Sequence, residues 1–119
     1  TFAHAYESHL GFSNKLNHGE AVIIGMKNAT KFSYKLKLLK KKTYNLIINH
    51  LNKVPLKKEF KELFKKKDID KIVSFMKSDK KNSSKNINII LIKNFGQIKI
   101  NYQIDQNLLN RFLVSELKK

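Results

Sequence analysis

The sequence predicts a mostly helical domain with one β-hairpin near its C-terminus. Apolar residues recur at spacings of three and four as far as Met76, which is typical of amphipathic helices. Between Ile87 and Tyr102 the period changes to two, around a turn-forming segment at 94–97, which is typical of two paired strands. A chain of 119 residues has the length of one domain, and no repeat or linker divides it. We therefore expect a single domain over 1–119.

The N-terminal region is expected to form two helices. Residues 1–10 have the pattern of the end of a helix, which Gly11 closes. A long helix is expected to begin near His18 and to end at Lys40–Lys42, because cations are favoured near a helix C-terminus. We expect its apolar stripe to comprise Val22, Ile23, Met26, Ala29, Phe32, Ser33 and Leu36.

Three shorter helices are expected in the middle of the chain and one at its end. Thr43 is expected to cap the first, which stops before Pro55. A short helix follows over 56–64, and Asp68 is expected to cap the next one. After the hairpin, Asp105 is expected to cap the last helix, whose apolar residues are Leu108, Leu109, Phe112, Leu113 and Leu117.

Composition limits the partners and the compartment. The net charge is +16, but Arg111 is the only arginine beside 24 lysines. Phosphate-reading surfaces usually include arginine, whereas abundant lysine, asparagine and isoleucine are typical of an AT-rich genome, so no nucleic-acid partner is expected. No apolar run approaches the roughly 18–20 residues that span a bilayer, so no membrane partner is expected. Cysteine is absent, which fits a reducing cytoplasm.

His18 and His4 are the candidates for a metal or anion site. A helix N-terminus disfavours the charged imidazolium of His18, and neutral imidazole is the form that binds metals. The short loop between the two helices predicts an antiparallel hairpin that brings His4 towards the same end. Two histidines do not complete a zinc site, so the residues alone leave open that both are ordinary helix residues. His9 and His50 are expected to be structural or surface residues.

A loop between the fifth predicted helix and the hairpin carries Lys80 and Lys81. Either lysine is long enough to reach an anionic ligand as a point charge. Taken alone, the segment fits a pair of solvated charges equally well.

Three segments resemble the 3-dehydroquinate synthase family. Thr1-Phe-Ala-His-Ala-Tyr-Glu7 resembles the end of its G-H-T-x-G-H-A-x-E signature, and His18-Gly-Glu-Ala-Val-Ile-Ile-Gly-Met26 resembles H-G-E-A-V-x-x-G-M. Asp79-Lys80-Lys81 resembles its D-K-K loop. The resemblance implies the helical C-terminal domain of a two-domain enzyme that forms 3-dehydroquinate and phosphate from 3-deoxy-D-arabino-heptulosonate 7-phosphate, in the shikimate pathway.

The same resemblance implies cofactors and residue roles. NAD is expected to bind mainly to an N-terminal domain outside this chain, and Zn²⁺ or Co²⁺ to bind His18. His4 matches a histidine near the phosphate of the phosphorylated sugar-acid substrate, where it would also assist proton movement. Lys80 or Lys81 matches a substrate-binding lysine, with Lys81 slightly favoured. The full-length family members are commonly homodimers.

Departures from the family pattern lead to further expectations. Ala3 stands where the family usually has glycine, which is expected to crowd the site modestly. The chain begins at Thr1, so another zinc-binding histidine is expected upstream, and this chain alone is expected to be inactive and to bind zinc weakly. Two alternatives stay open: another sugar-phosphate cyclase, or a non-catalytic basic binding module derived from this domain.

Overall fold

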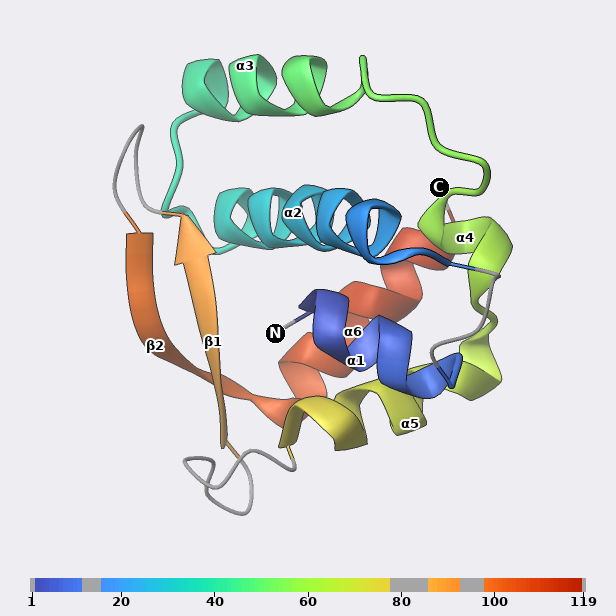
Figure 1. The fold of residues 1–119 in the computed structure, drawn as a ribbon. Helices are drawn as coiled ribbons and strands as arrows, with labels where there is room; N and C mark the ends of the chain where they lie inside the picture. The colour runs from blue at the N-terminus through green and yellow to red at the C-terminus, as the bar shows by residue number, and fades with distance from the viewer. Residues whose placement is uncertain (1, 12–15, 78–85, 93–97, 119) are drawn as a thin grey trace.

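The computed structural model describes residues 2–11, 16–77, 86–92 and 98–118, and it arranges them as helices beside one two-stranded sheet (Figure 1). The mostly helical fold with a late hairpin is therefore confirmed. In chain order the elements are α1 (Phe2–His9), α2 (His18–Lys35), α3 (Lys41–Leu51), α4 (Phe60–Leu63), α5 (Lys66–Lys77), β1 (Asn86–Ile92), β2 (Ile98–Asp105) and α6 (Gln106–Leu117).

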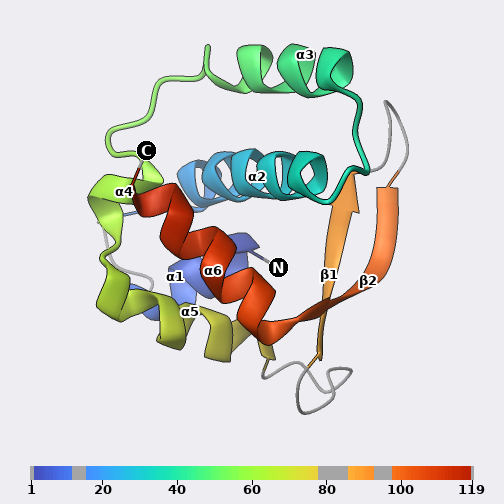
Figure 2. The ribbon, with the colours of Figure 1, turned by 180° about the vertical axis from the view of Figure 1, so that it is seen from behind.

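Helix α2 lies at the centre of the fold. Helix α1 runs in the opposite direction to α2, and α3 lies along another side of α2. In the view of Figure 1, α6 crosses behind α2, and Figure 2 shows it from the other side. The buried Phe32 of α2 stacks on Phe112 of α6 with ring centroids 4.5 Å apart. Because neighbours cover α2 on several sides, its buried surface is wider than the single stripe expected from the sequence. That stripe was wrong at Met26, which is 44% exposed.

The buried face of α2 also includes polar residues. The hydroxyl of Thr30 donates to the carbonyl of Met26 at 2.7 Å, and that of Ser33 donates to the carbonyl of Ala29 at 2.6 Å. These bonds within the helix give each of the two hydroxyl groups a hydrogen-bond acceptor.

The C-terminus of α2 corrects the first predicted boundary. The helix ends at Lys35, before the Lys40–Lys42 run, and Lys37 has a positive φ of 64°. The N–H of Leu38 donates to the carbonyl of Ser33 at 2.9 Å, and the N–H of Lys37 donates to that of Tyr34 at 3.0 Å. These two bonds form a Schellman motif. Lysine in place of the usual glycine hides this stop from the sequence pattern.

Two predicted caps also need correction. Helix α3 begins at Lys41, so Thr43 lies inside its first turn rather than at its cap. Helix α5 begins at Lys66, and Asp68 reaches back from the first turn to accept from the N–H of Lys65 at 2.8 Å. Between them, α4 covers only Phe60–Leu63 of the predicted 56–64.

The hairpin and the last helix agree with the prediction. Strands β1 and β2 are antiparallel, with Ile87 opposite Ile104 and a register shift between Ile89 and Leu91. The turn expected at 94–97 lies outside the described residues. Asp105 caps α6, as predicted, by accepting from the N–H of Asn107 at 2.7 Å. Within the described residues, no helix has the length and apolar character needed to cross a membrane.

Candidate functional site

The first turn of α2 is built by a capping box just before His18. The side chain of Asn17 accepts from the N–H of Glu20 at 2.8 Å, and Glu20 accepts from the N–H of Asn17 at 3.3 Å. The other carboxylate oxygen of Glu20 accepts from the N–H of Lys57 at 3.3 Å. Glu20 therefore shapes the start of the helix.

His18 is oriented by a carboxylate on the neighbouring helix. Its Nδ1 lies 2.9 Å from Oε1 of Glu7, and the His18 side chain is 77% exposed whereas that of Glu7 is 12% exposed. An ionised carboxylate only accepts, so Nδ1 carries the hydrogen and donates. In the neutral imidazole, Nε2 then has the free lone pair, and it faces away from this bond. A histidine held in this way by a carboxylate is the usual arrangement at protein metal sites.

His4 lies on the same helix as Glu7, one turn earlier, and its side chain is exposed. Residues three apart project from the same face of a helix, so His4 and Glu7 share a face of α1. The structure therefore places His4 one turn of α1 away from Glu7, the residue that contacts His18. Lys80 and Lys81 lie outside the described residues.

These residues fit part of a metal site. No group of three or more histidine, aspartate or glutamate side chains able to hold a metal occurs within 2–11, 16–77, 86–92 and 98–118. His18 offers one imidazole nitrogen oriented by Glu7, and a zinc or cobalt ion accepts such a ligand. A complete coordination shell needs ligands beyond these residues.

A buried hydrogen bond fixes the position of α1 against α2. The amide nitrogen of Asn28 donates to the hydroxyl oxygen of Tyr6 at 2.6 Å, and both residues are buried. Burial raises the pKa of Tyr6 far above its ordinary value, so the phenol stays neutral. Phe60 and Phe64 pack on the Tyr6 ring with centroids 5.4 and 5.3 Å away. Tyr6 therefore locks the helix that carries Glu7.

Gly25, from the second motif, allows α1 to approach closely. A Cβ at this position would lie 3.1 Å from the backbone nitrogen of Ala3 and 3.4 Å from Cβ of Phe2. Backbone atoms yield less readily than the end of a side chain. The glycine therefore sets the spacing between the helices that carry Glu7 and His18.

We expect Gly25→Ala to lower the free energy of unfolding by about 1–3 kcal/mol, the usual cost of overpacking. Gly19 on the same helix is the matched control, because a Cβ there meets only the side chain of Asn17 at 3.5 Å. Gly19→Ala should leave stability unchanged or raise it by up to about 1 kcal/mol. Urea unfolding of both variants provides the test, and equal stabilisation by the two substitutions would contradict the close approach.

His9 and Asp68 join α1 to α5. Nε2 of His9 lies 2.9 Å from Oδ1 of Asp68, and both side chains are largely buried. Burial opposes ionisation of Asp68, but its hydrogen bonds with the N–H of Lys65 and with His9 prevail and lower its pKa. The structural interpretation of His9 is therefore supported.

A lowered carboxyl pKa stabilises the fold at a pH above the ordinary value for aspartate, and this stabilisation is lost as the pH falls through the lowered value. We expect Asp68→Asn to reduce the free energy of unfolding at neutral pH by about 1.5–3 kcal/mol, as for a lost charged hydrogen bond, and to flatten the acid side of the stability curve. Asp70→Asn on the same helix should change little, because asparagine still accepts from Asn110. Identical curves for the two variants would argue against the His9–Asp68 link.

Glu7 lies in the first of the family motifs, whereas no sequence pattern singles out Tyr6 or Asn28. A carboxylate three residues after His4, facing a histidine at the start of the next helix, was a usable signal for the Glu7–His18 contact. The Tyr6–Asn28 bond spans 22 positions and depends on helix packing, so no local pattern indicates it.

Comparison with known proteins gives a consistent result. A family model described as 3-dehydroquinate synthase C-terminal matches residues 1–82. The 3-dehydroquinate synthase of Pelagibacter ubique (strain HTCC1062) is 45% identical over 119 residues, which are 100% of this chain and 32% of that protein. The 3-dehydroquinate synthase of Endomicrobium trichonymphae is 40% identical over 110 residues, covering 92% of this chain and 29% of that protein. The chain spans about a third of the length of these curated relatives.

A solved structure shares the fold. The crystal structure of 2-deoxy-scyllo-inosose synthase complexed with carbaglucose-6-phosphate, NAD⁺ and Co²⁺ matches with a TM-score of 0.66 at 20% sequence identity. The match covers 96% of this chain and 32% of the solved chain. Likeness at this level of identity concerns the arrangement of the helices and strands.

Proposed function

This chain belongs to the 3-dehydroquinate synthase family, and from that premise we propose that it forms the C-terminal part of an enzyme that converts 3-deoxy-D-arabino-heptulosonate 7-phosphate to 3-dehydroquinate and phosphate. The enzyme would use NAD and Zn²⁺ or Co²⁺, and act as a cytoplasmic homodimer in the shikimate pathway. The likeness of this fold to a cyclase complexed with a sugar-phosphate analogue, NAD⁺ and Co²⁺ supports the choice of ligands.

The observation that carries the proposal is the contact between Glu7 and His18. It joins the H-A-x-E and H-G-E segments, which lie 11 positions apart at these two residues, into one unit. When bound, the metal supplies Lewis-acid polarisation of substrate hydroxyls, and NAD supplies a transient oxidation. His18 would present Nε2 as a metal ligand, while Glu7 holds the imidazole tautomer and its direction.

We assign His4 a different task. Its exposed imidazole on the Glu7 face of α1 is suited to contact the substrate phosphate and to move a proton beside it. Lys80 or Lys81 would add a positive charge to an anionic group of the substrate, Lys81 being slightly favoured.

The proposal predicts that Glu7→Gln weakens metal binding by about 10–100-fold, as does loss of other carboxylates that support a metal-bound histidine. Glu20→Gln is the matched control. Glu20 makes its hydrogen bonds with Asn17 and Lys57, whereas Glu7 makes the contact with His18. Glutamine at position 20 keeps the capping box. Metal affinity is measured by competition with a chelator. A similar loss in both variants would indicate that the start of α2, not the Glu7 contact, sets the affinity.

A chimera tests the function itself. This chain replaces the matching 32% of the Pelagibacter ubique relative, and formation of 3-dehydroquinate and phosphate is followed with NAD and Zn²⁺. We expect turnover within about tenfold of the unaltered relative, a difference of about 1.4 kcal/mol in the barrier. A folded chimera that binds NAD and metal but forms no product would overturn the proposal.

A second substrate in the same assay distinguishes 3-dehydroquinate synthase activity from that of another sugar-phosphate cyclase. The fold shared with 2-deoxy-scyllo-inosose synthase keeps another sugar-phosphate cyclase as the second candidate. Glucose 6-phosphate is therefore offered to the same chimera under the same conditions. Faster phosphate release from glucose 6-phosphate than from the heptulosonate would favour that second candidate.

A further inference from the structure

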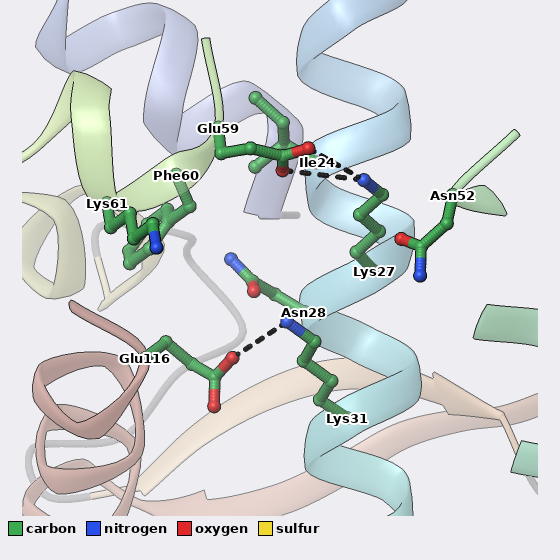
Figure 3. Close-up of a pocket in the computed structure, with 9 residues that line it drawn as sticks. All are labelled: Ile24, Lys27, Asn28, Lys31, Asn52, Glu59, Phe60, Lys61 and Glu116. Carbon is green, nitrogen blue, oxygen red and sulfur yellow. Dashed lines mark hydrogen bonds and ion pairs between the residues drawn. The ribbon is translucent and has the colours of Figure 1, made fainter. Parts of the chain in front are cut away.

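A cavity of about 260 Å³ lies between α2, the start of α4 and α6, and none of its lining residues belongs to the Glu7–His18 unit (Figure 3). Lys27 and Lys31 enter it from successive turns of α2. Glu59 just before α4 and Glu116 on α6 face them from the other side. Each lysine pairs with one glutamate.

The two ion pairs differ in which partner is buried. Nζ of Lys27 lies 3.1 and 3.4 Å from the two carboxylate oxygens of Glu59, and the Lys27 side chain is 8% exposed whereas that of Glu59 is 46% exposed. In the second pair, at 3.1 Å, Lys31 is 30% exposed and Glu116 is 2% exposed. The first pair therefore buries its cation, and the second buries its anion.

Because of this difference, the anionic partner of Lys27 can be exchanged for another anion. A buried ammonium without an anion is strongly unfavourable, so Lys27 needs a negative partner at all times. An exposed carboxylate gains little from such a pair, so Glu59 can leave Lys27 at small cost if another anion takes its place. Glu116 lacks this freedom because it is enclosed.

The remaining lining also favours a small organic anion. Lys61 adds a third ammonium on the wall opposite α2, so the lining lysines exceed the glutamates by one (Figure 3). The amides of Asn28 and Asn52 border the space, and the buried side chains of Ile24 and Phe60 provide apolar wall.

We propose that this cavity binds a small organic anion whose carboxylate or phosphate group replaces Glu59 on Lys27. Glu59 acts as a built-in competitor that keeps Lys27 neutralised when the ligand is absent. The ligand's apolar part packs against Ile24 and Phe60, and Lys31 stays with Glu116.

The test is an NMR titration of the ¹⁵N-labelled 119-residue chain with inorganic phosphate and, separately, with acetate at constant ionic strength. We expect saturable shifts at the lining residues, with a dissociation constant on the order of 1 mM for at least one probe. Saturable shifts with phosphate alone would indicate that the ligand carries a phosphoryl group. Saturable shifts with acetate alone would indicate that it carries a carboxylate. No saturable shift with either probe would overturn the proposal.

Three variants separate the cavity from the overall positive charge. Glu59→Gln should tighten anion binding several-fold, because the competing charge is gone, and Lys27→Met should abolish saturable binding. Lys71→Met removes an exposed lysine of α5 that does not line the cavity and should bind as the unaltered chain does. Equal weakening in Lys27→Met and Lys71→Met, or no tightening in Glu59→Gln, would overturn the proposal. Glu59→Gln decides the matter even if Lys27→Met does not fold.

Discussion

In the chimera with the Pelagibacter ubique relative, His18→Ala is expected to lower turnover by at least about 10³-fold and to remove the bound metal. His18 provides the one imidazole nitrogen that Glu7 orients, and alanine offers no ligand. Loss of metal polarisation removes several kcal/mol of transition-state stabilisation, at about 1.4 kcal/mol for each factor of ten. Turnover and metal content are measured on the same preparation.

His50→Ala is the control for this substitution. His50 is exposed in the last turn of α3, and the proposal gives it no role. We expect unchanged metal content and activity. A His18→Ala chimera that keeps its metal would refute the assignment of His18, and a comparable loss in His50→Ala would indicate a general effect of removing histidines.

His4→Ala is expected to reduce turnover by about 10²–10⁴-fold, the usual contribution of a positioned acid–base group. Metal content should stay the same, because the Glu7–His18 contact does not use His4. The pH dependence of kcat should also change, since the group proposed to move the proton has been removed. An unchanged pH profile together with a purely raised KM would reduce His4 to a binding residue.

The sequence was sufficient for most of the fold because helical and strand periods differ clearly. The change from spacings of three and four to a spacing of two located the hairpin, and Asp105 identified the last helix by its capping chemistry. The C-terminal boundary of α2 was predicted wrongly because an unusual residue ends the helix. Lys37 adopts the left-handed conformation normally given to glycine, so the end of α2 was predicted too late.

The candidate site was predictable as a pair of motifs but not as a contact. Periodicity placed His4 and His18 on two helices, and family resemblance suggested their roles. The Glu7–His18 bond depends on the depth at which α1 packs on α2. That depth is set by the missing side chain of Gly25 and by the Tyr6–Asn28 bond. Such tertiary packing leaves no local pattern in a single sequence.

The central claim is that His18 holds the metal and His4 acts on the substrate. Metal content of the His18→Ala and His4→Ala chimeras, after identical dialysis, tests this division most directly. The account predicts that metal is lost from the first variant and retained in full by the second. Equal loss from both variants, or loss from His4→Ala alone, would contradict it.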